Sequence, residues 1–351
     1  NETIAAELGL KLSNVEATIK LIDEGNTIPF IARYRKEVTG GMTDVVLRDL
    51  EERLTYLRNL QERKEEVIRL IEEQGKLTDE LKEAILSAEM LQRVEDLYKP
   101  FKQKRATRAS KARERGLEPL ALIIKAMDIT AGTPEEVAEP FISKDAELIE
   151  SGKAVGTAAD ALAGASDIIA ETIADDPDFN QDLRKMTLQK GQIIAEAVDP
   201  EESTVYDMYY EYEEALLKIP NHRILAINRG EKEKKLKVKI KAPIETIHNI
   251  LKSAVITNEQ SIFLNLMNTA VEDAYKRLMA PSIEREIRNT LTERAEKEAL
   301  KIFSRNTEKL LLTPPVKGAR VIAIDPGFRT GCKVTMLDET GKLLAYTTIY
   351  P

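Results

Sequence analysis

The sequence holds few of the residues on which disulfide, zinc and histidine chemistry depend. Its 351 residues include one cysteine, Cys332, and two histidines, His222 and His248. A single cysteine excludes an internal disulfide and a cysteine-rich zinc site, and two histidines leave little room for histidine-based catalysis. We therefore expect no bound metal and no cofactor.

Long apolar runs are also missing. No run approaches the roughly 18 residues that a membrane span requires. No hydrophobic stretch of a secretory signal precedes the first helices. We therefore expect a cytoplasmic protein without a membrane partner.

Glycine, proline and aromatic residues are scarce as well. Sixteen glycines and 14 prolines fall below the usual share of roughly 12%, and aromatic residues make up only 5%. Few turns are therefore expected. Apolar residues reach 42% and charged residues 32%, which is typical of a helix-rich protein with a sizeable core. The length suggests about two to three domains.

Charge is segregated along the chain. The overall net charge of −8 is the sum of −7 in residues 1–98, +7 in residues 99–115, −16 in residues 116–219 and +8 in residues 220–351. The overall value argues against a nucleic-acid partner. The two basic segments keep such a partner open, because charge asymmetry within a chain indicates an interaction that the mean conceals.

Residues 1–75 are predicted to form a helix-turn-helix region followed by one long helix. Gly9 falls where a sharp turn belongs, and Thr43 can cap the long helix, which ends at Gly75. Residues 1–32 carry a net charge of −3, which is the wrong sign for a helix that faces phosphates. We interpret these helices as a structural bundle rather than a DNA reader.

The apolar stripe of the long helix is interrupted near its centre, where Gln61 and Lys64 fall on it. A weakened seam favours packing against globular neighbours over a long coiled coil.

Residues 76–316 are predicted to form an elongated central helical region with a short β insertion near 224–241. Helices are expected at about 158–175 and 180–194, among others. Within the insertion, Leu236, Val238 and Ile240 alternate with lysines, as in a half-exposed strand. The run just before it, HRILAINRG, fits a strand or a helix. Pro281 is expected to break the helices that follow.

Residues 317–351 read as β structure. The apolar run 321–324 predicts a strand buried on both faces, and 331–337 and 343–349 predict two further strands of a meander. Three strands rarely make a stable sheet alone. We therefore expect the chain to be a piece of a longer protein that ends inside its last domain.

Several long motifs, in one order, resemble the Tex family of bacterial transcription accessory proteins. They are IPFIARYRKEVTGG (28–41), VEDLYKPFKQKRATRASKARERGLEPLA (94–121), ALAGASDIIAE (161–171), MAPSIEREIR (279–288) and AIDPGFRTGCKV (323–334). The resemblance implies a mainly α fold, with a helix-turn-helix region and a central helical region that lead into the first strands of a truncated RNase-H-like (YqgF-type) α/β domain.

The same resemblance implies a function and partners. Family members continue into helix-hairpin-helix elements and an OB-fold RNA-binding domain, and these parts are usually credited with binding nucleic acid. We therefore expect a non-enzymatic helical scaffold whose partner is RNA or DNA, bound mainly through those further domains. The transcription machinery is a second expected partner.

The densest basic cluster lies in residues 99–115, which hold eight basic side chains and one acid. If residues 106–115 are helical, Arg108, Lys111 and Arg115 share a face, because they lie three and four residues apart. Two interpretations stay open: these cations bind phosphates, or they pair with the acidic flanking segments. The candidate nucleic-acid-binding residues are Lys102, Lys104, Arg105, Arg108, Lys111, Arg113 and Arg115.

A second basic cluster surrounds the predicted strand of the β insertion. It comprises Lys232, Lys234, Lys235, Lys237, Lys239 and Lys241. No aromatic residue interleaves it, so it lacks a base-stacking platform. We interpret the lysines as the solvated side of an edge strand, where they discourage sheet-to-sheet aggregation.

Asp325 is the candidate catalytic residue of an alternative function. The RNase-H-like resemblance places the first metal-binding carboxylate there, which implies a metal-dependent nuclease or resolvase in the full-length protein. Two-metal hydrolysis needs several carboxylates, and one is not a site.

The loop DPGFRTG also resembles the phosphate hairpin of actin-like ATPases, with Gly327, Thr330 and Gly331 near the phosphates. We expect neither activity from residues 1–351.

Overall fold

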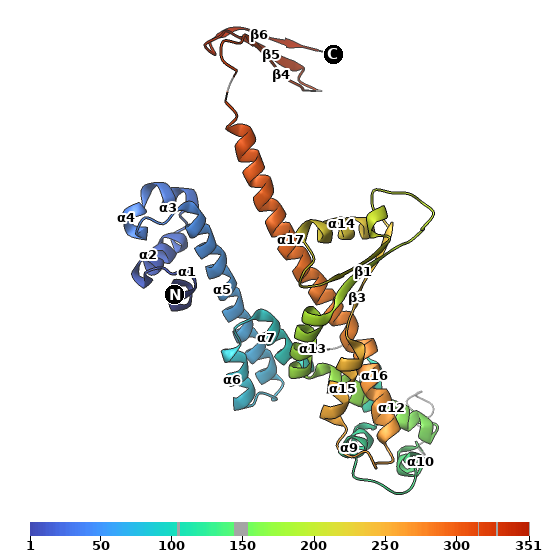
Figure 1. Cartoon of the computed structure of the whole chain (residues 1–351). Helices are drawn as coiled ribbons and strands as arrows, with labels where there is room; N and C mark the ends of the chain where they lie inside the picture. The colour runs from blue at the N-terminus through green and yellow to red at the C-terminus, as the bar shows by residue number, and fades with distance from the viewer. Residues whose placement is uncertain (104–105, 144–153, 315, 328, 351) are drawn as a thin grey trace. The chain divides into compact units, whose positions relative to one another are not determined.

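The computed structural model describes residues 1–351 except 104–105, 144–153, 315, 328 and 351 (Figure 1). The chain divides into two compact units. The first comprises Asn1–Ile219 and Gly230–Asn289, and the second comprises Pro220–Arg229 and Thr290–Pro351. As predicted, most described residues are helical, and the strands form two small sheets.

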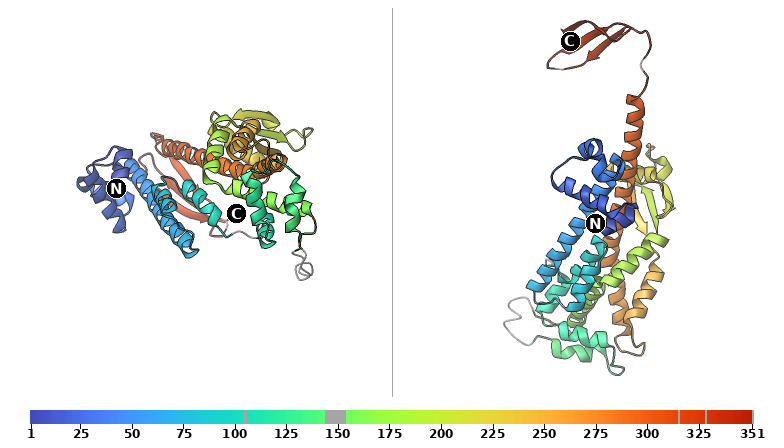
Figure 2. Two further views of the ribbon diagram at one scale, coloured as in Figure 1. Left: turned by 90° about the horizontal axis from the view of Figure 1, so that it is seen from below. Right: turned by 90° about the vertical axis from the view of Figure 1, so that its left-hand side faces the viewer.

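The first unit begins with four short helices that pack on one half of a long one. They are α1 (Glu2–Leu8), α2 (Leu12–Asp23), α3 (Ile28–Tyr34), α4 (Lys36–Thr39) and α5 (Asp44–Glu73). Gly9 turns the chain with a φ of 64°, where glycine carries no steric penalty. The Thr43 side chain accepts a hydrogen bond from the Val46 N–H and caps α5, as predicted. Figure 2 shows these helices gathered at one end of α5.

The two halves of α5 belong to different apolar clusters. Leu47, Leu50 and Leu54 pack with the α1–α4 residues. Residues from Leu60 to Ile71 pack instead with α6 (Asp79–Ser87) and α7 (Leu91–Tyr98). Lys64, which interrupts the stripe, is buried, and its Nζ donates to the Leu86 carbonyl over 2.7 Å. The prediction of globular packing along α5 is thus confirmed.

The centre of the first unit is α12 (Ala158–Asp175). Its buried residues include Ala161, Leu162, Ala165, Ile168 and Ile169, and small side chains let neighbouring helices approach closely. The helices packed around it include α8 (Arg108–Glu114), α9 (Glu118–Ala126), α10 (Pro134–Ala138) and α16 (Leu264–Asp273). Short 3₁₀ turns follow α7 and α10, at Lys99–Phe101 and Glu139–Phe141.

The first sheet has strand order β2-β1-β3 and is antiparallel throughout. Its strands are β1 (Gln192–Ala197), β2 (Glu211–Ala215) and β3 (Leu236–Lys241), and a 3₁₀ turn, Asp207–Tyr209, precedes β2. Ile194 of β1 lies between Glu213 of β2 and Lys239 of β3.

This sheet corrects two predictions. The helix expected to reach residue 194 is α13 (Pro177–Lys190), which ends before β1. At Gly191 a Cβ would overlap the Thr187 carbonyl, so glycine permits the close exit from helix to strand. The β insertion near 224–241 is also wrong in its first part, because residues 221–232 form a helix, α14 (Asn221–Lys232). A short apolar run suits either structure.

The helices after β3 run without the expected break at Pro281. They are α15 (Ile244–Val255), α16, a π-helical turn (Ala274–Met279) and α17 (Ala280–Leu311). Pro281 cannot donate a backbone hydrogen bond, but it stands in the first turn of α17, directly after the π-helical turn. The wider turn allows the chain to stay helical through the proline.

The second sheet is the predicted meander, with strands β4 (Val321–Asp325), β5 (Cys332–Leu337) and β6 (Leu343–Ile349) in order β4-β5-β6. The prediction that the first strand is buried on both faces is wrong here, since Val321, Ile322 and Ile324 are exposed. An apolar run indicates that a strand is buried once another layer of structure packs against it. The described residues supply no such layer on either face of this sheet.

Candidate nucleic-acid interface

Helix α8 carries the centre of the predicted basic cluster. Thr107 and Ser110 form a capping box at its start, so the sequence fixes where the helix begins. Ala109 and Ala112 are buried on the side that packs against α12. The Thr107 hydroxyl donates to Glu171, and the Ser110 hydroxyl donates to the Thr107 carbonyl. Both hydroxyls are thereby engaged within the protein.

Arg113 lies on the packed side of α8 and has a structural role. Its guanidinium forms ion pairs with Glu171 of α12 over 2.6 Å and with Glu118 over 3.0 Å. Burial opposes its charge, but the two carboxylates raise the pKa of Arg113 above its ordinary value. Because Glu171 is itself buried, Arg113 compensates an internal charge and fastens α8 to α12.

The cations before α8 are also partly engaged. Lys102 pairs with Glu95 over 3.5 Å and lies over the Tyr98 ring. Lys99 donates to the Ala174 carbonyl and to the Asn180 side chain, which ties the turn after α7 to α12 and α13. Lys104 and Arg105, the two other candidates in this stretch, lie outside the described residues.

Arg108, Lys111 and Arg115 form the outer side of the cluster. All three are exposed, and none forms an ion pair with a carboxylate in the described part of the chain. Arg108 acts on Asp167 only through its charge. Burial raises the pKa of that carboxyl, and the charges of Arg277 and Arg108 act against the rise. Of the five candidates that the structure describes, Lys102 and Arg113 are engaged in ion pairs, and the other three face solvent and are here called the α8 outer face.

The second basic cluster behaves as predicted for an edge strand. β3 is an outer strand of its sheet. Lys235 pairs with Glu202 over 2.6 Å, Lys239 with Glu196 over 3.3 Å and Lys241 with Glu213 over 3.0 Å. These lysines are exposed or half-exposed, but they already have acidic partners.

Asp325 stands at the end of β4, exposed and opposite Lys333 of β5. Within the described residues, no group of three or more acidic, histidine or cysteine side chains could hold a metal ion. The loop that follows is tight, because a Cβ at Gly327 would overlap the Thr330 hydroxyl and the Gly331 carbonyl. The residues present do not fit a two-metal centre, which requires several carboxylates.

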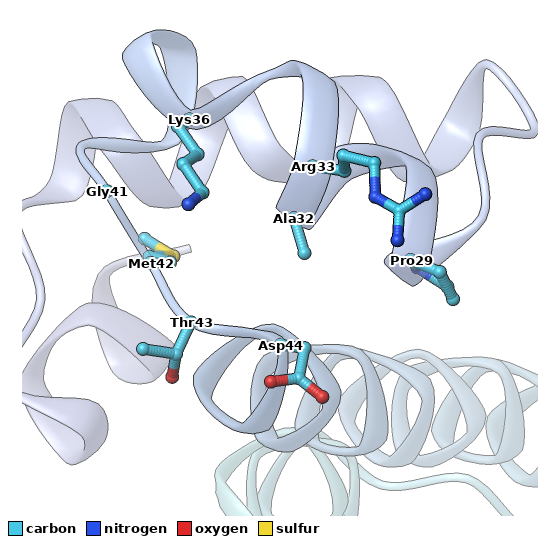
Figure 3. Close-up of a pocket in the computed structure, with 8 residues that line it drawn as sticks. All are labelled: Pro29, Ala32, Arg33, Lys36, Gly41, Met42, Thr43 and Asp44. Carbon is cyan, nitrogen blue, oxygen red and sulfur yellow. The ribbon is translucent and has the colours of Figure 1, made fainter. Parts of the chain in front are cut away.

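A further feature was missed by the sequence reasoning. A hollow of about 470 Å³ lies between α3, α4 and the start of α5 (Figure 3). Arg33 and Lys36 reach toward it from one side, and Thr43 and Asp44 line the other. A signal for it lies in the motif IPFIARYRKE, where three cations stand among two aromatic residues.

The architecture is that of a helical protein in which a bundle on a long helix, a central helical region and a small terminal meander follow one another. Family models match these parts in the same order. The Tex-like protein N-terminal domain matches residues 1–72, the Tex central region-like model residues 130–303 and the Tex protein YqgF-like domain residues 319–351. The chain belongs to the Tex family.

Individual relatives agree with this assignment. Protein YdcI of Bacillus subtilis is 48% identical over 100% of this chain and 48% of its own length. The transcriptional accessory protein Tex of Neisseria gonorrhoeae is 36% identical over 99% of the chain and 45% of its own length. The human S1 RNA-binding domain-containing protein 1 is 29% identical over 95% of the chain and 34% of its own length. The chain thus spans about half the length of the bacterial relatives.

Among the described helices, none is both long enough and apolar enough to cross a membrane.

Proposed function

We propose that this chain is the helical scaffold of a nucleic-acid-associated transcription accessory protein. The family assignment supports the link to transcription, because a relative that aligns with 99% of the chain carries that description. The name of the human relative supports RNA as one ligand of the whole protein. The chain itself would position other nucleic-acid-binding parts, carry no catalytic activity and work in the cytoplasm.

The observation that carries a direct role in binding is the α8 outer face. Arg108, Lys111 and Arg115 are exposed and lack ion-pair partners among the described residues, whereas Arg113 on the same helix is paired. A phosphate backbone can therefore approach these three side chains without displacing an internal carboxylate. Because α8 presents no aromatic residue, its contacts would be electrostatic and independent of sequence.

The test is the salt dependence of binding to a short DNA duplex, measured by fluorescence anisotropy. Each phosphate contact adds about 0.9 to the steepness of log K against log salt on B-DNA. Changing Arg108, Lys111 and Arg115 together to glutamine should therefore make the slope shallower by about 2.7.

A matched control is available on β3. Changing Lys235, Lys239 and Lys241 to glutamine removes the same charge from lysines that already have acidic partners. We expect this variant to keep the wild-type slope. Equal slopes for the wild type and the α8 variant, or equal losses in both variants, would contradict a specific role for α8.

The nuclease alternative concerns the full-length protein and Asp325. Its test is divalent-metal-dependent cleavage by that protein and by its Asp325→Asn variant. Cleavage that is lost in the variant would replace the non-catalytic proposal.

A further inference from the structure

Helix α3 exposes two aromatic side chains on one face. Phe30 and Tyr34 are 37% and 56% exposed, and their rings lie 5.3 Å apart at an interplanar angle of 48°. They are four residues apart, so they are neighbours on the helix surface. Two adjacent exposed aromatic rings indicate an interaction surface. The core of the bundle does not need them, since Ile28 and Ile31 are the residues of α3 that fill it.

Cations surround these rings. Arg33 stands between Phe30 and Tyr34 in the sequence, and Lys36 begins α4; both line the hollow and form no ion pair in the described part of the chain (Figure 3). The Arg35 guanidinium lies 5.5 Å from the centre of the Phe30 ring. Residues 28–43 hold these three cations and a single acid, Glu37. This stretch is therefore basic within the acidic first 98 residues.

Two groups of acidic side chains near the patch have to be considered. Asp44 lines the far side of the hollow, but Arg48 lies 3.9 Å from its carboxylate. One acid of α1 and one of α2 pair with α5: Glu7 with Arg53 over 2.5 Å and Asp23 with Arg58 over 2.7 Å. Hydrogen bonds from these arginines lower the pKa values of Glu7 and Asp23. Glu7 and Asp23 are thus locally balanced by arginines of α5.

We propose that Phe30, Arg33, Tyr34 and Lys36, here called the α3 patch, bind single-stranded nucleic acid. Unstacked bases would lie on the Tyr34 and Phe30 rings, and Arg33 and Lys36 would meet the phosphates beside them. A duplex keeps its bases stacked on one another and offers these rings no base face. The ligand class is the one named in the proposed function, but the surface and the mode of contact are different.

The α3 patch and the α8 outer face predict different selectivities. The three cations of α8 have no aromatic neighbour on that helix, so they should bind single strands and duplexes alike. The α3 patch should favour single strands, because stacking supplies much of its affinity. A protein partner that uses the same aromatic and arginine side chains is the competing occupant.

The experiment uses the complete 351-residue chain and a labelled oligouridylate of about 12 nucleotides, a length within the range of single-strand sites. Tyr34→Ala should weaken binding about tenfold, since it removes the stacking of one base. It should leave duplex affinity within about twofold of the wild type. Phe303→Ala is the matched control, because Phe303 is an exposed aromatic residue of α17, and it should change neither affinity.

Tyr34→Trp supplies a readout of stacking itself. The chain contains no tryptophan, so this variant carries a single indole, at the position of the proposed contact. Saturable quenching by the oligouridylate but not by a duplex is expected, with single-strand affinity near that of the wild type. Arg33→Gln with Lys36→Gln should make the single-strand salt slope shallower by about 1.4, at about 0.7 for each contact.

Three results would overturn the inference. They are unchanged oligouridylate affinity in Tyr34→Ala, equal losses on single strand and duplex, and an unquenched Tyr34→Trp variant. The first would leave a protein partner as the competing occupant of the patch. None of them depends on α8, whose variant is measured separately on the duplex, so the two proposals can fail independently.

Discussion

A buried ionic clamp in the first unit gives the sharpest test of how its helices are held together. Arg184 of α13 makes two hydrogen bonds, of 2.9 and 3.0 Å, with Asp96 of α7, and a third of 2.6 Å with Glu286 at the start of α17. The Asp96 side chain is only 5% exposed. Arg184→Met keeps most of the side-chain volume but leaves this carboxylate buried without its cation. The expected loss of stability is about 3–5 kcal/mol.

The same reasoning predicts that a second change repairs the first. Arg184→Met combined with Asp96→Leu removes both charges and fills the space with apolar atoms, so its stability should return to within about 1 kcal/mol of the wild type. Arg69→Met serves as the control, because its pair with Glu73 is exposed and contributes only about 0.3–0.5 kcal/mol.

The measurement has to report on the first unit alone, since the chain has two. Hydrogen exchange of the slowest amides in α7 and α13 gives the free energy of opening where the clamp lies. A double variant as unstable as Arg184→Met would refute the argument, because the loss would then come from packing rather than from an uncompensated carboxylate.

Three further predictions concern packing, pH and the division of the basic cluster. Gly164→Ala should destabilise the protein by about 1–3 kcal/mol in urea unfolding, although alanine is the better helix former, because its Cβ would overlap the buried Leu117 side chain. Burial, with the charge of Glu284, raises the pKa of Tyr275 from 10.0 to about 12. The unfolded phenol therefore ionises first as the pH rises through this window. Stability should fall there by up to about 1.4 kcal/mol per pH unit, and Tyr275→Phe should flatten the profile. Arg113→Gln should lower the melting temperature without changing the salt slope of duplex binding; a shallower slope at an unchanged melting temperature would reverse the roles assigned to α8.

Local signals in the sequence sufficed for most of the helices. Thr43 was identified as a cap, and its side chain accepts the backbone hydrogen bond expected of it. The alternation around Val238 likewise located β3. These features depend on residues a few positions apart, so their outcome hardly varies with the rest of the fold.

The missed strands show which elements local sequence signals cannot predict. β2 has the sequence EYEEA, which carries no strand preference beyond its tyrosine, and it is a strand because β1 pairs with it. β1 in turn pairs on its other side with β3, whose residues lie 39 to 49 positions further along the chain. Pairing of this kind is decided by tertiary contacts, which override propensity.

For the same reason, the sequence located the basic cluster but could not show which of its cations form ion pairs. Arg113 and Arg115 are both cations in one short segment. They differ because Arg113 pairs with Glu118 and with Glu171, which lies 58 residues away along the chain. The acidic segment carries enough charge to neutralise the whole cluster. It pairs with the cluster on one side of α8 only, because a helix can present just one face to α12. The net charge of a segment therefore tells which ionic partners it can offer. The packing of its helices determines which of these partners form ion pairs. The exposed cations of the α8 outer face therefore follow from amphipathic packing, and a polyanion that binds there would displace water rather than any carboxylate of the described residues.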